Sequence, residues 1–234
     1  MSEMEEKIEQ LKADLLNKVE QVKPLLRGWF HAGAAVGALA LTIVLCCLCW
    51  GDWPRFVSML VFGLSMTLLY TVSAVYHIGA WRGWWIRFWR SFDHANIFAM
   101  IAGTYTAICF NVLEGWLRIS LLVLIWLLAL VGILVTVFSG QLPRVVRTSL
   151  YIGMGWVGLL ALPALLEALP LPAIVMILLG GILYTLGGLV YSKRWPDPFP
   201  RVFGFHEIFH LFVIAASAVF AVCVMLWALP YARN

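Results

Sequence analysis

The chain has 234 residues, of which 63% are hydrophobic and only 12% are charged. Because a soluble domain is typically ~45–50% apolar and about 25% charged, this composition excludes an ordinary soluble domain and predicts a membrane protein. The formal net charge is only +4, and no basic stripe is interleaved with aromatic side chains, which excludes a nucleic-acid-binding protein.

The polar N-terminal segment predicts an amphipathic helix. Its charged residues stand in the wrong order for a secretory signal peptide. Within 2–26, acids and lysines alternate around apolar residues that recur at helical spacing and form one stripe. We therefore expect residues 1–27 to form a cytoplasmic helix that ends near Pro24. The stripe could lie on the membrane, pack under the bundle, or pair with a second copy to form a homo-oligomer.

Seven apolar runs follow, each about long enough to cross a bilayer core of ~30 Å as a helix rising 1.5 Å per residue. Short, turn-like connections separate them and leave no room for an inserted soluble domain. We expect residues 28–234 to form one all-α domain, a bundle of seven transmembrane helices. The expected spans cover 29–50, 55–80, 93–112, 117–138, 148–168, 172–192 and 204–229.

Proline and glycine inside these spans have structural interpretations. Pro163 is expected to kink the fifth span. The pairs 180–181 and 187–188 are Gly-Gly in mid-span, with no strand before them. They indicate close contacts between helices rather than a nucleotide-binding loop.

The distribution of Lys and Arg predicts the orientation of the chain. With the N-terminus inside, thirteen of the sixteen cationic residues fall in inner segments, and only Arg55, Arg118 and Arg233 fall outside. The N-terminus is therefore expected in the cytoplasm, and an odd number of spans places the C-terminus on the other side. The expected location is the inner (plasma) membrane of a bacterium.

Four ionisable residues then share one depth in the membrane. His77 ends the second span, Asp93 begins the third, and His206 and His210 occupy the first two turns of the seventh. Ser73 lies one helical turn deeper than His77, on the same face. Ionisable groups within lipid are costly and mark functional sites. We therefore expect these residues to meet near the cytoplasmic leaflet.

This set of residue types suits a zinc ion. Catalytic zinc takes three protein ligands plus water, and two histidines four residues apart can bind the same ion. His77, His206 and His210 would be the ligands, and Asp93 would act on the metal-held water as general base or ligate directly. Iron or manganese could occupy the same donors. The main rival is a hydrogen-bonded proton or ion path, and Asp93 could instead pair with Arg90.

The motifs resemble those of a known family. The runs 73–77 (SAVYH), 92–95 (FDHA), 102–106 (AGTYT) and 203–210 (FGFHEIFH) closely resemble the hemolysin III family. That family is the bacterial branch of the progestin and adipoQ receptor superfamily and is distantly related to alkaline ceramidases. The resemblance extends from about Gly28 to Trp227. It implies a seven-helix bundle, zinc on His77, His206 and His210, Asp93 at the metal-bound water and Ser73 beside it.

The expected function is a zinc-dependent hydrolase of a lipid amide or ester, ceramidase-like, acting on a membrane lipid in lipid homeostasis. Asp93 and Ser73 are the candidate catalytic residues. One alternative is a receptor or sensor in which zinc is structural. Another is a cytolysin or channel, although no span carries a polar stripe from face to face as a conducting pore needs.

Overall fold

The computed structural model describes residues 24–138 and 142–232, and the described residues form helices and no strands. The amphipathic helix expected over 1–27 lies almost wholly outside them. In chain order the helices are α2 (Trp29–Leu48), α3 (Trp53–Ile78), α4 (Trp84–Val112), α5 (Gly115–Phe138), α6 (Arg144–Trp156), α7 (Leu162–Ala168), α8 (Leu171–Lys193) and α9 (Phe205–Cys223). A 3₁₀ segment, Val157–Ala161, links α6 to α7, and a π-helical turn, Val224–Ala228, extends α9.

The described residues contain seven helical spans that are long and apolar enough to cross a membrane. This confirms the all-α, seven-span fold. The third span begins at Trp84, earlier than the expected start at 93. The arginines in 84–92 ended the apolar run in the sequence, but a helix can continue past the hydrocarbon core into the polar interface.

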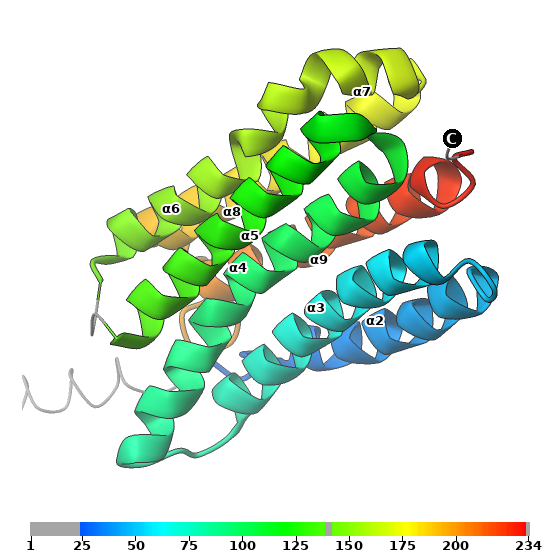
Figure 1. Cartoon of the computed structure of the whole chain (residues 1–234). Helices are drawn as coiled ribbons and strands as arrows, with labels where there is room; N and C mark the ends of the chain where they lie inside the picture. Colours follow the sequence, from blue (N-terminus) through cyan, green and yellow to red (C-terminus); the bar gives the residue numbers. More distant parts are fainter. Residues whose placement is uncertain (1–23, 139–141, 233–234) are drawn as a thin grey trace, which may run out of the picture.

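The fifth span is broken as Pro163 predicts. Its two helical pieces, α6 and α7, are joined by the 3₁₀ segment, and Pro163 lies in the first turn of α7. Proline fits the first turn because its missing N–H would have no partner there. Figure 1 shows the chain changing direction at this point.

Two sets of neighbouring helices build the bundle. The α3 helix packs between α2 and α4, α5 covers α4, and α9 packs along α8 (Figure 1). The central helices α3 and α4 are mostly buried, whereas α2, α5 and α8 present large apolar side chains outwards. A lipid-facing surface explains this exposure, because such side chains would not face water over so large an area.

The glycine pairs of α8 lie at helix contacts. A Cβ on Gly180 would lie 2.5 Å from the Phe220 ring, and one on Gly187 would lie 2.8 Å from Phe212 Cβ. Both partners belong to α9. Glycine therefore sets the close approach of α8 and α9, as the sequence indicated.

The segment before α2 is tied to the segment before α9. The backbone N–H groups of Leu25 and Leu26 donate to the carbonyl oxygens of Arg201 and Val202. These bonds bring the start of α2 to the start of α9. The histidines of α9 are therefore held at the end of the bundle where α3 ends and α4 begins.

Candidate metal centre

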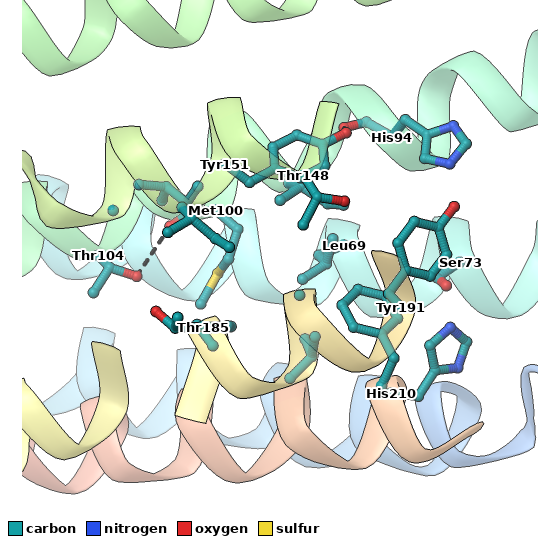
Figure 2. Close-up of a pocket in the computed structure, with 18 of the residues that line it drawn as sticks. Leu69, Ser73, His94, Met100, Thr104, Thr148, Tyr151, Thr185, Tyr191 and His210 are labelled. Carbon is teal, nitrogen blue, oxygen red and sulfur yellow. Dashed lines mark hydrogen bonds between the residues drawn. The ribbon is translucent and has the colours of Figure 1, made fainter. Parts of the chain in front are cut away.

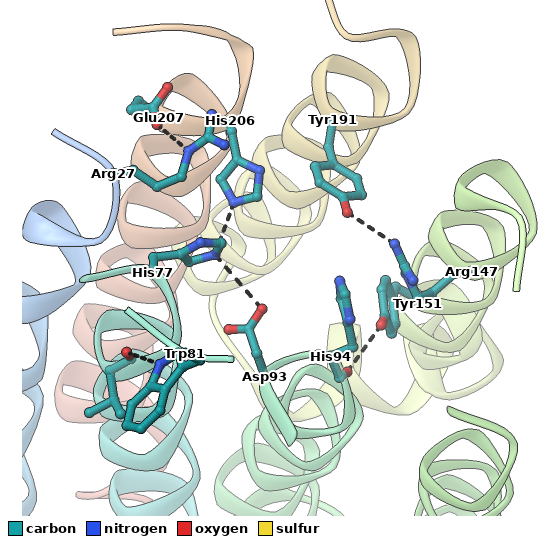
Figure 3. A network of polar contacts seen from close by, with 11 residues as sticks. Arg27, His77, Trp81, Asp93, His94, Arg147, Tyr151, Tyr191, His206 and Glu207 are labelled. Carbon is teal, nitrogen blue, oxygen red and sulfur yellow. Dashed lines mark hydrogen bonds and ion pairs between the residues drawn. The ribbon is translucent and has the colours of Figure 1, made fainter. Parts of the chain in front are cut away.

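Three histidine side chains from two helices meet at this end of the bundle. His77 lies in the last turn of α3, and His206 and His210 lie in the first turns of α9. One nitrogen from each ring lies within 4.8 Å of the others. The His206 Nε2 and His77 Nε2 atoms are 3.2 Å apart, and Figure 3 shows the two rings pointing toward each other.

The two candidate catalytic residues lie beside this cluster. Asp93, from α4, places its Oδ2 3.9 Å from His77 Nε2 (Figure 3). Ser73, one turn before His77 on α3, lines the same cavity as Asp93. Both side chains are buried. All five residues singled out in the sequence therefore meet in space, contributed by three helices.

An apolar cavity of about 120 Å³ adjoins the cluster. Helices α4, α6, α8 and α9 supply most of its walls, and Ser73, Asp93, His206 and His210 lie at one end of it. Figure 2 shows Leu69 and Met100 lining the space that leads away from the histidines. The centre therefore borders a space lined by hydrocarbon, with its polar groups confined to one end.

A fourth histidine, His31 on α2, belongs to the same cluster although the sequence interpretation did not include it. Its ring stacks on His210, with centroids 3.8 Å apart and planes 12° from parallel. It is almost fully buried, and neither ring nitrogen has a hydrogen-bond partner among the described residues. The signal that could have found it was the presence of an ionisable group inside the first span.

Glu207 turns away from the cavity and binds Arg27. The Arg27 Nε donates to Glu207 Oε1 at 2.8 Å, and the Gly204 backbone N–H donates to Oε2 at 2.7 Å. Glu207 is completely buried. Its helical position, about 100° from His206, explains why it does not join the histidines.

His94, next to Asp93, also points elsewhere. Its backbone carbonyl accepts a hydrogen bond from Tyr151, and its side chain lies toward Arg147 (Figure 3). Arg147 in turn donates to the Tyr191 hydroxyl at 3.0 Å. His94 is therefore not one of the three histidines whose nitrogens come together.

The donor set fits a metal ion. Two zinc-bound nitrogens at ~2.0–2.1 Å in a tetrahedral site lie roughly 3.3 Å apart, close to the 3.2 Å separation of His77 and His206. His210 Nδ1 is buried without a hydrogen-bond partner. Imidazole ligands suit zinc, copper, iron and nickel. The residues present could therefore hold one ion between α3 and α9.

Fold and site together define an all-α integral membrane protein with seven spans and a buried candidate metal centre of three histidines. A family model described as Haemolysin-III related matches residues 19–221. The chain belongs to this family.

Similar proteins include two from bacilli and one from mammals. The chain is 35% identical over 171 residues to the Hemolysin-3 homolog of Bacillus subtilis (strain 168), covering 73% of this chain and 77% of that protein. It is 36% identical over 183 residues to Hemolysin-3 of Bacillus cereus, covering 78% and 80%. It is 28% identical over 194 residues to the human Monocyte to macrophage differentiation factor, covering 81% and 77%.

Proposed function

We propose that this protein is a zinc-dependent hydrolase of a lipid amide or ester and serves membrane-lipid homeostasis. The observation that carries the proposal is the placement of three converging imidazoles, a carboxylate and a hydroxyl at one end of an apolar cavity. A lipid has both parts that this arrangement suits, a polar carbonyl and a long alkyl chain.

Each residue has a role that its position supports. His77, His206 and His210 would hold zinc, which when bound supplies Lewis-acid chemistry toward a carbonyl. Asp93, whose Oδ2 is 3.9 Å from His77 Nε2, would take a proton and return it to the leaving group. The Ser73 hydroxyl would orient the Asp93 carboxyl or the substrate carbonyl.

The cavity would bind the alkyl chain and exclude water. Its walls come largely from apolar side chains, and burial of each CH₂ contributes about 0.8 kcal/mol. A chain lying along it would place the adjoining carbonyl at the polar end. The reacting group would thus be positioned by binding of the part of the substrate that does not react.

The proposed setting is a bacterial plasma membrane with the N-terminus in the cytoplasm and the C-terminus outside. The asymmetry of Lys and Arg supports this orientation. The histidines would then lie near the cytoplasmic leaflet. A lipid of that leaflet would be the substrate.

Metal content tests the centre directly. We expect the detergent-purified protein to carry about one zinc per chain, and the His206→Ala/His210→Ala variant to carry none, since loss of two of three ligands leaves no site. His94→Ala is the matched control, because its side chain points away from the centre, and it should retain zinc. Absence of metal from wild type purified without chelators would refute the centre, and the histidines would then favour a proton or ion relay.

Turnover is tested with Asp93→Asn. This variant should keep its zinc but lose hydrolysis of a lipid amide or ester by ~10²–10⁴-fold, the usual contribution of a general acid–base group. The measurement is release of fatty acid from a panel of lipids by zinc-loaded protein. If no lipid is cleaved and Asp93→Ala leaves the cellular lipid profile unchanged, zinc is structural and the receptor or sensor alternative takes precedence.

The names of the bacillus relatives favour a second candidate function, a cytolysin or channel. Liposomes containing the purified, zinc-loaded protein should then conduct ions or leak a trapped dye. We expect neither, because the described part of the bundle has a core of clustered apolar side chains, whereas a conducting pore needs a polar path from one face to the other.

A further inference from the structure

A second cleft, of about 590 Å³, lies between α4, α5 and α6 at the same end of the bundle as the histidines. His94 borders both this cleft and the apolar cavity. The volume is in the range of ~300–1,000 Å³ that small-molecule sites occupy. We name this space the α4–α6 cleft. It is lined by Trp84, Arg87, Phe88, Arg90, Ser91, Phe92, His94, Ala95, Asn96, Ile133, Thr136, Val137, Leu142 and Arg147.

The α4–α6 cleft is strongly cationic. Arg87, Arg90 and Arg147 line it, and none of the described residues that line it is acidic. Arg147 is only 6% exposed, and its Nη2 is engaged by the neutral hydroxyl of Tyr191. A buried guanidinium is costly unless an anion is nearby, and the carboxylate whose charge acts on Arg147, Asp93, lines the apolar cavity rather than the cleft. The cleft is therefore suited to an anionic ligand.

Three buried donors from three helices, all on residues that line this cleft, have no hydrogen-bond partner within 24–138 and 142–232. They are Arg147 Nε on α6, Asn96 Nδ2 on α4 and Thr136 Oγ1 on α5. Their residues are 6%, 6% and 8% exposed, respectively. Nearly all buried polar groups in proteins are hydrogen-bonded. Unpartnered donors on residues that line one cleft are suited to the oxygens of a phosphate, and guanidinium groups bind phosphate through charge-assisted bonds.

The rest of the lining indicates where that phosphate comes from. Trp84, Phe88 and Phe92 are exposed aromatic residues at the start of α4, and Ile133 and Val137 face them from the end of α5. Tryptophan at the end of a membrane span marks the headgroup level of the bilayer. Basic pockets between spans on the cytoplasmic side bind phospholipid headgroups.

We propose that the α4–α6 cleft binds the phosphate of an anionic phospholipid, with its acyl chains lying along α4 and α5. Arg87, Arg90 and Arg147 supply the charge. Asn96 and Thr136 donate to the phosphate oxygens. The site uses no residue of the histidine cluster, so it does not depend on zinc or on hydrolysis.

The test is titration of the full-length, detergent-purified protein with phosphatidylglycerol, followed by native mass spectrometry. We expect one tight lipid per chain and weaker binding of phosphatidylcholine, whose headgroup has no net charge. The Arg90→Gln/Arg147→Gln variant should bind phosphatidylglycerol at least ~10-fold more weakly. The Arg82→Gln/Arg201→Gln variant is the matched control, because it removes two exposed charges at the same end of the bundle and outside the cleft. Equal affinity of the two variants would overturn the proposal.

The Thr136→Val variant tests the same site if the double arginine variant does not fold. Valine has the shape of threonine, and the Thr136 hydroxyl has no hydrogen-bond partner among the residues that the structure describes, so thermal stability should be unchanged or higher. Affinity for phosphatidylglycerol should still fall, by about 10-fold. Unchanged affinity in this variant would also overturn the proposal.

Two further measurements distinguish binding at the α4–α6 cleft from binding at the histidines, and a phospholipid from free phosphate. The His206→Ala/His210→Ala variant should bind phosphatidylglycerol as wild type does, and a loss there would show that the lipid sits at the histidines instead. Inorganic phosphate at millimolar concentration should not displace the lipid. If phosphate displaced the lipid, the cleft would be a site for phosphate, and the proposal that its ligand is a phospholipid would be overturned.

Discussion

At the residue scale, neighbouring side chains of α9 contact different partners. His206 and His210 line the cavity, whereas the buried side chain of Glu207 between them points away from the cavity to Arg27. The helical rotation of about 100° per residue produces this separation. The Arg27–Glu207 pair then fixes the start of α9 against the segment before α2, close to the candidate ligands.

We predict that Glu207→Ala destabilises the protein by ~3 kcal/mol, the low end of the ~3–5 kcal/mol range that is usual for removing one partner from a buried ion pair. Glu207 is completely buried, and the Arg27 side chain is 22% exposed, so the upper part of this range is not expected. Thermal unfolding in detergent measures the effect. Glu167→Ala, which removes an exposed carboxylate, is the control and should change stability little.

The double variant Arg27→Met/Glu207→Leu provides the complementary test. Replacing both charges by apolar groups leaves no uncompensated charge, so it should destabilise less than Glu207→Ala alone. A double variant less stable than the single variant would show that the ion pair is not the source of the effect.

At the element scale, the position of α9 depends on α8. Glycines of α8 admit aromatic side chains of α9 so closely that no other residue fits without movement. Since α9 supplies two of the three candidate ligands, this contact also sets the distance from His206 and His210 to His77 on α3.

Gly187→Ala is therefore expected to destabilise the bundle by ~1–3 kcal/mol, because its Cβ would lie 2.8 Å from Phe212 Cβ and the helices would have to separate. Gly153→Ala on α6 is the matched control, since nothing lies within 4 Å of its added Cβ. That control should be neutral or slightly stabilising, as alanine favours a helix. Similar melting temperatures for the two variants would contradict close packing of α8 on α9.

At the scale of the whole molecule, charge and site occupy the same end of the bundle. The cationic residues that predict the cytoplasmic side include Arg87, Arg90 and Arg147, which line the α4–α6 cleft. The histidine cluster lies at this end too. The orientation of the protein therefore decides which leaflet supplies any lipid that binds to either site.

Reporter fusions test the predicted orientation. Alkaline phosphatase, which folds only outside the cytoplasm, should be active when fused after residue 234 and inactive when fused after residue 195. The positive-inside distribution of Lys and Arg is the physical reason. The opposite pattern would place the histidines at the outer leaflet and exclude a cytoplasmic-leaflet substrate.

The sequence by itself determined the number of spans and the depth of five polar residues. Both depend on local properties. An apolar run of sufficient length must form a helix in lipid, and the position of each span in the chain sets its direction across the membrane, and so the end of the bundle at which each residue lies. Ser73, His77, Asp93, His206 and His210 were found in this way. The start of α4 at Trp84 was missed because arginine interrupts an apolar run without ending a helix.

Only the tertiary structure decided which side chains touch. Helix rotation and packing turn Glu207 to Arg27, stack His31 on His210, and leave three unpartnered donors around the α4–α6 cleft. No spacing along the chain predicts the first two contacts, since each joins residues about 180 positions apart in the sequence. Such contacts depend on the angle and distance between helices, which are set by side-chain packing over the whole bundle.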